Sequence, residues 1–323
     1  TSTKVEPGIN MKNVSILGSG SWALALSKIL KPTKLIVKCR NIEKVKKKFK
    51  SHHILLTDNF EKIIQTKTIF IAIPSQSVRQ NLLDLRLSEK SKKEKKIFII
   101  CSKGVERKTF KLMSEVVSEI FPNSMISVLS GPNFSSELIK KKPSASVLSS
   151  KNKSVLKEIS DLIIQEKFRT YFNNDIIGTQ IGGAMKNIIA IACGYIAGCG
   201  LGENAKAAII TRGLSEIIDL GIKMGAKRNT FYGLSGIGDL TLSCSSLKSR
   251  NAKFGYNLAK SKDHPHTNIL LEGIESCESI CALGEKFNVD LPISKSVKSI
   301  INGGNANKVI FESFFLFCWS LHR

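Results

Sequence analysis

The sequence predicts an α/β domain, in which helices cover a parallel sheet, followed by an all-helical domain. In the first half, short apolar β-runs alternate with helical patterns, which is the order typical of a parallel sheet. From Asp175 onward the apolar residues recur at helical spacing. The length of 323 residues also favours two domains. We therefore expect a first domain over residues 11–173 and a second over residues 174–323.

Residues 1–10 precede the first methionine, Met11, and lack the apolar core of a signal peptide. We interpret them as a cloning remnant or a disordered extension. Lysines and glycines interrupt every long apolar run before it reaches the roughly 18 residues of a membrane span. We therefore expect a cytoplasmic protein without a membrane span.

The first β-run, Val14–Leu17, leads directly into a glycine-rich turn and then into a helical pattern that ends near Leu30. The turn reads Gly-x-Gly-x-x-Ala. Gly18 permits a tight bend, Gly20 lets backbone N–H groups approach a pyrophosphate, and the small Ala23 lets the helix pack on the strand. Phosphates bind at such helix N-termini. The turn predicts a Rossmann-type domain that binds a dinucleotide, and the alternative is a simple packing turn.

The second β-run, Leu35–Val37, ends in Lys-Cys-Arg rather than in an acid. An NAD site usually has an acid near this point to bind the ribose hydroxyls. Arg40 instead suits a 2′-phosphate, which favours NADP(H). Glu43 is an acid close to this point, so NAD(H) remains a possible cofactor. The other interpretation of Arg40 is a solvated charge in a loop without a role in binding.

Lys103 lies in one of the polar loops that follow the later β-runs. Ligands of parallel sheets bind beyond the carboxyl ends of the strands, so we expect Lys103 on the cofactor side. The predicted strands are 68–73, 97–101, 125–129, 144–148 and 168–172, and the loops of interest are 74–76, 102–104 and 130–134.

Lys186 lies in an otherwise apolar helical segment, where isoleucines recur at positions 177, 181, 188 and 191. Helical side chains lean toward the N-terminus, so Lys186 lies over Gly182 and Gly183 and should border a pocket. Partial desolvation lowers the pKa of an amine and makes it a candidate general acid or base. The alternative is a lysine whose stem packs on the core while its ammonium reaches water.

Two further segments of the helical half carry polar groups. Asp239 follows three glycines, at 233, 236 and 238, and either caps a helix or belongs to a site. Arg250 stands between Ser249 and Asn251, and its guanidinium could bind a phosphate through two hydrogen bonds. A helix is expected from Ala205 to Met224, closed by Gly225.

The formal net charge is +23, from 49 Lys and Arg against 26 Asp and Glu. This charge raises binding to nucleic acid or to an anionic membrane as a rival function. However, the lysine runs at 44–50 and 90–96 contain few aromatic side chains for base stacking, and no nucleic-acid motif is present. We expect no nucleic-acid partner, and a positive field that attracts small phosphorylated anions.

Eight cysteines are scattered without a Cys-x-x-Cys pair and without histidines at ligand spacing. Cys277 and Cys281 share a helical face, but two ligands alone are a weak metal signal. We expect reduced thiols and no metal site.

Together these blocks resemble the NAD(P)-dependent glycerol-3-phosphate dehydrogenase family of bacteria. The Gly-Ala-Met-Lys-Asn and Gly-Asp-Leu blocks, in that order, are its most specific motifs here. The matching blocks are 18–23, 102–106, 130–138, 182–191, 204–216, 236–240, 249–251 and 272–273.

The resemblance implies that the substrate lies between the two domains. It also implies reversible hydride transfer from NAD(P)H to dihydroxyacetone phosphate, which gives sn-glycerol 3-phosphate for glycerophospholipid synthesis, and a homodimer is a further expectation. The implied catalytic residues are Lys186, Lys103 and Asp239. The implied substrate-binding residues are Lys103, Gly131, Asn133, Lys186, Asp239, Ser249, Arg250 and Asn251. The implied cofactor-binding residues are Gly18, Gly20, Ser21, Trp22, Arg40, Lys103, Ser135, Arg250, Leu270 and Glu272.

The sequence departs from the family pattern at three places. Ala23 replaces the third glycine of the turn, the segment 51–57 is short, and Asn133 stands where Thr or Ser is commoner. Another hydroxyacid dehydrogenase of the same architecture is the alternative enzyme, but it gives no reason for the Ser-Arg-Asn block. The non-enzymatic alternative remains a protein that binds nucleic acid or anionic membranes.

Overall fold

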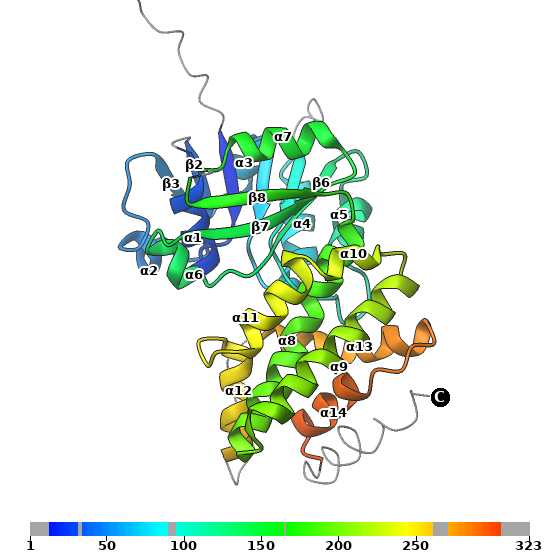
Figure 1. Cartoon of the computed structure of the whole chain (residues 1–323). Coiled ribbons are helices and arrows are strands. Elements are labelled where there is room, and N and C mark those ends of the chain that lie inside the picture. The colour runs from blue at the N-terminus through cyan, green and yellow to red at the C-terminus, as the bar shows by residue number, and fades with distance from the viewer. Residues whose placement is uncertain (1–12, 32–33, 90–94, 165, 261–270, 305–323) are drawn as a thin grey trace, which may run out of the picture.

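The structure, a computed structural model, describes residues 13–31, 34–89, 95–164, 166–260 and 271–304. Its first half is a sheet with helices on both faces, and its second half is a group of helices below the sheet (Figure 1). The strands are β1 Val14–Leu17, β2 Leu35–Lys38, β3 Ile54–Thr57, β4 Thr68–Ile71, β5 Ile97–Ile100, β6 Met125–Ser130, β7 Ser144–Ser149 and β8 Phe168–Asn173.

The helices of the first half are α1 Ser21–Ile29, α2 Ile42–Lys46, α3 Phe60–Ile64, η1 Ser75–Ser77, α4 Val78–Leu87, α5 Met113–Ile120, α6 Ser135–Ile139 and α7 Lys153–Asp161. Those of the second half are α8 Ile176–Cys199, α9 Gly202–Lys223, α10 Arg228–Phe231, η2 Leu234–Gly238, α11 Asp239–Cys244, α12 Arg250–Lys260, α13 Glu272–Lys286 and α14 Pro292–Ile301.

The strands form one sheet in the order β3-β2-β1-β4-β5-β6-β7-β8. The predicted strands are confirmed, but β3 was not predicted and forms a short parallel edge strand beside β2. The expectation of a purely parallel sheet is wrong at one point, because β7 pairs antiparallel with β6 while β8 runs parallel to β7. Both strands therefore run opposite to the first six.

The strand residues alternate between two apolar layers, as the period of two requires. Val14, Ile16 and Val37 face the layer formed with α1 and α7. Leu17 and Ile36 face the other layer, which includes α3, α4 and α5. Because both faces are covered, these short strands are mostly apolar rather than alternating with polar residues.

Helix α8 is the axis of the second half, and most of its side chains are buried. It packs against α12 so closely that a Cβ on Gly194 would lie 1.9 Å from the Ala252 carbonyl oxygen. Within the described chain, α8 alone has the length and mean hydropathy of a membrane span. However, 83% of that window is buried by the protein's own helices, as in a core helix.

Candidate active site

Helix α8 carries Lys186 from the sheet into the helical half. Near its start, the Thr179 hydroxyl lies 2.6 Å from the hydroxyl of Ser149 on β7. One turn later, Gly183 lies against the side chain of Ser130, the last residue of β6. Lys186 follows after nearly another turn, so its ammonium lies just beyond the carboxyl end of β6.

Three charged side chains meet at this point. The ammonium of Lys186 lies 2.8 Å from Oδ1 of Asp239, and the ammonium of Lys103 lies 2.5 Å from Oδ2 of the same carboxylate. Lys103 also donates to the Gly131 carbonyl oxygen at 3.3 Å. Asp239 is 1% exposed, whereas Lys186 and Lys103 keep 12% and 19% of their side-chain surface accessible. The predicted catalytic residues therefore form one cluster with two cations and one anion.

The two glycines before Lys186 make this cluster possible, but not in the predicted way. A Cβ on Gly182 would lie 2.4 Å from the Ser235 carbonyl oxygen. A Cβ on Gly183 would meet Ser130 Oγ at 3.1 Å and the Lys103 stem at 3.4 Å. The expected pocket over these glycines is therefore wrong, because neighbouring groups of the site fill that space.

Burial and the shared carboxylate set the charge states of the cluster. Desolvation lowers the pKa of the Lys186 ammonium, and the negative charge of Asp239 only partly offsets this effect. Burial alone would raise the pKa of Asp239, but the positive charges of Lys103 and Lys186 outweigh it and hold that pKa below its ordinary value. The arrangement therefore favours an ionised carboxylate beside an amine that releases its proton more readily than an ordinary lysine.

Glu272 is a fourth charged group near the cluster. It begins α13 and accepts a hydrogen bond from the backbone N–H of Lys103. Burial raises the pKa of Glu272 to about 7, although the charges of Lys103, Arg250 and Lys186 act in the opposite direction. These contacts connect the predicted cofactor residue Glu272 with the substrate residues.

Asp239 reaches the cluster through a tight turn rather than by capping a helix. The segment Leu234–Gly238 forms a π-helical turn, and Asp239 begins α11 directly after it. A Cβ on Gly236 would lie 2.1 Å from the Phe231 carbonyl oxygen, so the turn tolerates no side chain there. The cap interpretation is wrong, because both carboxylate oxygens of Asp239 contact the two lysines.

The Ser-Arg-Asn block lies at the start of α12. Ser249 Oγ accepts a hydrogen bond from the Ala252 N–H at 3.4 Å and is buried. Arg250 is exposed at the first position of the helix. Asn251 is buried and faces inward, where its amide donates to Asn187 Oδ1 at 3.0 Å and accepts from the Gly273 N–H at 3.3 Å. Arg250 is therefore the member of the block whose side chain is available for a phosphate.

Asn133 is close to the cluster in sequence but faces away from it. Its amide nitrogen donates to the Ala145 carbonyl oxygen at 3.1 Å and to Ser146 Oγ at 2.7 Å. Its carbonyl accepts from Ser144 Oγ at 2.6 Å. The donors of Asn133 are therefore occupied by β7, whereas the neighbouring Gly131 contributes its carbonyl oxygen to Lys103.

The glycine-rich turn fits a dinucleotide phosphate. Gly18 has a φ of +120°, and a Cβ there would lie 2.4 Å from the Ala72 carbonyl oxygen. Above Gly20 there is open space within 4 Å of an added Cβ. Helix α1 begins at Ser21 without a capping side chain, so its first N–H groups remain available for an anion.

The other predicted cofactor residues are distributed around the same edge of the sheet. Trp22 lies on the first turn of α1 and packs against the core, and Ser135 begins α6, which lies beside α1. Arg40 is exposed just past the end of β2. Leu270 lies outside the described residues.

Two residues near the cluster were missed by the sequence interpretation. Ser243, on α11, accepts a hydrogen bond from the Lys186 ammonium at 2.7 Å and is 2% exposed. Asn187 contacts Asn251, as described above. The spacing of four residues between Asp239 and Ser243 is the one available signal, since it places both side chains on one face of a helix.

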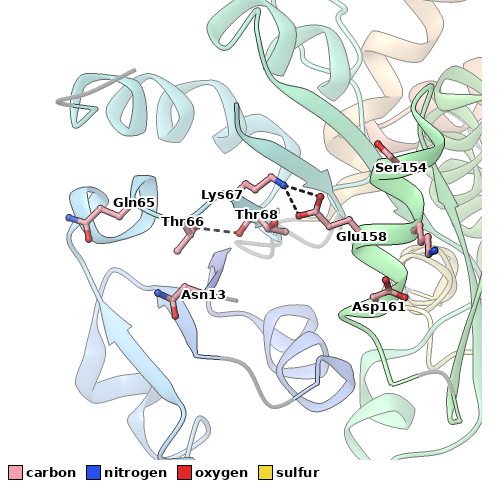
Figure 2. Close-up of a pocket in the computed structure, with 9 residues that line it drawn as sticks. Asn13, Gln65, Thr66, Lys67, Thr68, Ser154, Glu158 and Asp161 are labelled. Carbon is pink, nitrogen blue, oxygen red and sulfur yellow. Dashed lines mark hydrogen bonds and ion pairs between the residues drawn. The ribbon is translucent and has the colours of Figure 1, made fainter. Parts of the chain in front are cut away.

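A hollow of about 500 Å³ lies at the other edge of the sheet, near the amino ends of β1 and β4. Figure 2 shows Lys67 and Glu158 pointing toward one another there, with their charged groups 2.8 Å apart. Because Lys67 and Glu158 neutralise one another, we do not assign chemistry to this hollow. Within the residues that the structure describes, no group of three or more His, Cys, Asp or Glu side chains could hold a metal ion.

Comparisons with known proteins show which family the chain is similar to. The family model described as NAD-dependent glycerol-3-phosphate dehydrogenase N-terminus matches residues 33–156, and the corresponding C-terminus model matches residues 175–312. Glycerol-3-phosphate dehydrogenase [NAD(P)+] of Halalkalibacterium halodurans is 35% identical over 316 residues, which cover 91% of each chain. The enzyme of the same name from Staphylococcus aureus strain COL is 38% identical over 90% of this chain and 94% of its own.

Solved structures show the same similarity. Glycerol-3-phosphate dehydrogenase from Coxiella burnetii superposes with a TM-score of 0.87 at 28% identity, covering 93% of this chain and 98% of its own. Glycerol-3-phosphate dehydrogenase from Saccharomyces cerevisiae gives a TM-score of 0.78 at 21% identity, covering 94% of this chain and 99% of its own. The second comparison supports the fold alone.

Proposed function

The chain belongs to the NAD-dependent glycerol-3-phosphate dehydrogenase family, and we propose that its Lys186–Asp239–Lys103 cluster performs the acid–base step of that reaction. The enzyme is an NAD(P)-dependent glycerol-3-phosphate dehydrogenase. It interconverts dihydroxyacetone phosphate and sn-glycerol 3-phosphate with a nicotinamide cofactor. The observation that carries the residue assignment is the shared Asp239 carboxylate, which holds two ammonium groups beyond the carboxyl end of β6.

Lys186 is the proposed proton donor. The nicotinamide cofactor, when bound, supplies the hydride to the substrate carbonyl carbon. An alkoxide then develops on the carbonyl oxygen and must be protonated. Lys186 suits this role because desolvation lowers its pKa, so that it releases a proton more readily. The negative charge of Asp239 acts in the opposite direction and stabilises the protonated ammonium form.

Lys103 and Asp239 are the proposed positioning and electrostatic groups. Asp239 contacts both amines and so fixes their spacing. Two ammonium groups against one carboxylate leave one excess positive charge in the cluster, and such a charge stabilises a developing alkoxide. The buried Ser243 hydroxyl accepts a second hydrogen bond from Lys186 and further restricts its ammonium.

Arg250 is the proposed phosphate ligand. Its guanidinium is exposed at the N-terminus of α12, where backbone N–H groups and the helix dipole also favour an anion. A phosphate held there would orient the substrate carbonyl toward Lys186, which raises the effective concentration of the reacting groups. Asn251 has its amide engaged with Asn187 and Gly273, so we propose that it supports the site by joining α8, α12 and α13.

The proposed cofactor site is the turn from Gly18 to Ser21. Its open helix N-terminus suits the pyrophosphate, and Arg40 at the end of β2 suits a 2′-phosphate. We therefore propose that NADP(H) is preferred over NAD(H). A homodimer, a cytoplasmic location and a domain boundary near residues 173 and 174 stay predictions from the sequence.

An initial-rate assay tests the function and the cofactor preference together. Oxidation of NADPH and NADH is followed with dihydroxyacetone phosphate as substrate, and with dihydroxyacetone as the control that lacks the phosphate. We expect oxidation that depends on the phosphorylated ketone and is more efficient with NADPH. Equal turnover of unphosphorylated hydroxyacids would favour the alternative hydroxyacid dehydrogenase. Salt-sensitive duplex binding without any oxidation would favour the nucleic-acid binder.

A further inference from the structure

Lys38 is the last residue of β2 and lies directly beside the glycine-rich turn. It is in register with Leu17 of β1 and with Thr57 of β3. Its carbonyl oxygen accepts a hydrogen bond from the Gly18 N–H at 3.2 Å. Lys38 therefore lies at the same edge of the sheet as the proposed pyrophosphate site.

The Lys38 side chain is half-buried and held in place by an aromatic ring. Its ammonium lies 4.3 Å from the ring centroid of Phe60, the first residue of α3. A cation over a ring face at this distance is attracted by the electron density of the ring. Among the described residues, no carboxylate forms an ion pair with the Lys38 ammonium.

Arg40 follows Lys38 by two residues, just past the end of β2. The hydrogen bonding between β2 and β3 continues to Cys39, whose N–H donates to the Thr57 carbonyl oxygen at 2.9 Å. Cys39 is 3% exposed, whereas Lys38 is half-buried and Arg40, in the bend that follows, is exposed. Two cations thus flank a buried thiol at the end of β2.

Lys38 lies close to the position that contacts the adenosine ribose in dinucleotide-binding domains. About 20 residues after the first glycine of the turn, an NAD enzyme carries an acid that accepts hydrogen bonds from the ribose hydroxyls. In this chain the residues near that point include two cations, Lys38 and Arg40, and Lys38 is the one that lies on the strand itself. An ammonium cannot accept those hydrogen bonds, but it can donate several to a phosphate.

We propose that Lys38, held by Phe60, is a specificity-determining residue that binds the 2′-phosphate of NADP(H) together with Arg40. The assignment rests on the proposed function, since it requires a dinucleotide at the turn that starts at Gly18. It adds a second cation on β2 itself, with a side chain less free to move than that of the exposed Arg40. The nicotinamide end of the cofactor makes no contact with Lys38 in this scheme.

Binding measurements on fragments of the cofactor test this directly. Calorimetry gives the dissociation constants of 2′,5′-ADP and 5′-AMP, and of NADPH and NADH, for the wild-type protein, Lys38→Met and Lys38→Arg. We expect Lys38→Met to weaken 2′,5′-ADP and NADPH by about 10-fold or more, because one charge-assisted hydrogen bond is lost. The affinities for 5′-AMP and NADH should not change, and Lys38→Arg should keep most of the affinity for 2′,5′-ADP.

Lys34→Met is the matched control. Lys34 immediately precedes β2 and is exposed at the other edge of the sheet, so the variant removes the same charge from the opposite end of the strand. It should bind all four compounds like the wild type. If Lys38→Met binds 2′,5′-ADP as tightly as the wild type does, or loses 5′-AMP and 2′,5′-ADP equally, the assignment of Lys38 is wrong. If the wild-type protein binds neither NADPH nor NADH and reduces no ketone, the proposed function fails, and the inference fails with it.

Discussion

The ammonium of Lys186 lies 2.8 Å from the Asp239 carboxylate, and the two side chains come from different helices, α8 and α11. Asp239 is almost fully excluded from water, so this ion pair is screened much less than a surface pair. The same carboxylate holds Lys103, which follows β5 in the first half of the chain. One acid therefore joins the sheet and the helical half at the point where the substrate is proposed to react.

Replacing Asp239 with Asn should change both the pH profile and the stability. The carboxylate raises the pKa of Lys186, so its removal should lower that pKa further and reduce the fraction of Lys186 that carries a proton. Ketone reduction should then decline at a lower pH than in the wild type. Two ammonium groups would also lose their counter-charge, at a cost of about 3–5 kcal/mol in the free energy of unfolding.

The measurements for Asp239→Asn are the pH dependence of kcat and a urea titration. Asp290→Asn is a suitable control, because Asp290 pairs with Lys295 at the exposed surface. That variant should resemble the wild type in both experiments. An Asp239→Asn variant with an unchanged pH profile would contradict the role of the carboxylate.

Replacing Arg250 with Met should raise KM for dihydroxyacetone phosphate by about 10-fold or more, because charge-assisted hydrogen bonds to the phosphate are lost. Turnover of unphosphorylated dihydroxyacetone should be nearly unaffected. Lys253→Met, about one turn later and exposed on the same helix, controls for the general loss of positive charge. Equal effects of both substitutions on KM would argue for long-range attraction rather than for a phosphate contact at Arg250.

Gly182→Ala should reduce activity by moving the turn that carries Asp239. The added methyl group would lie 2.4 Å from the Ser235 carbonyl oxygen, a backbone atom that can only yield if the π-helical turn shifts. Gly233→Ala is the matched control, since its methyl group meets its nearest neighbour at 3.4 Å. We expect kcat to fall in the first variant and not in the second. Wild-type kcat in Gly182→Ala would show that the close approach is not needed.

Glu216 should make the stability depend on pH. It is 5% exposed, and it accepts hydrogen bonds from the N–H and the hydroxyl of Ser294 at the start of α14. Burial raises its pKa to about 7 from an ordinary value of 4.5. The folded protein therefore keeps a proton that the unfolded chain releases between about pH 4.5 and 7. Stability from this group is complete below that window and is lost as the pH rises through it.

The loss amounts to at most about 1.4 kcal/mol per pH unit for one group. Glu272 acts in the same direction, because burial also raises its pKa to about 7. The urea concentration at the unfolding midpoint should thus be higher at pH 5 than at pH 7 in the wild type. This difference should be smaller in Glu216→Gln. A pH dependence of equal size in that variant would exclude Glu216 as its source.

The sequence was sufficient to predict most strands and the residues of the cluster, for identifiable physical reasons. Strands buried on both faces are continuous apolar runs, and an ammonium inside an apolar helix stands out because its burial is costly. β3 was missed because it is a short edge strand with only one buried residue. The antiparallel direction of β7 was missed because an apolar run in the sequence does not show in which direction its strand pairs with its neighbour.

The contacts that place the site were beyond prediction from the sequence. Asn133 and Asn251 are both predicted to contact substrate, and the structure adds that their amides hydrogen-bond to distant parts of the chain. Their partners are 11 to 13 and 22 to 64 positions away in the chain, and only the folded arrangement brings them together. Ser243 was overlooked for the same reason, since a serine on a helix carries no sign of a lysine 57 positions earlier.

The most direct test of the central assignment is steady-state kinetics of Lys186→Ala with NADPH and dihydroxyacetone phosphate. The account predicts that kcat falls by about 100-fold or more while KM changes little, because the lost group acts mainly in the transition state. Lys206→Ala, which removes a lysine that pairs with the exposed Glu203, should keep normal kinetics. A folded Lys186→Ala enzyme with near-normal kcat would contradict the assignment.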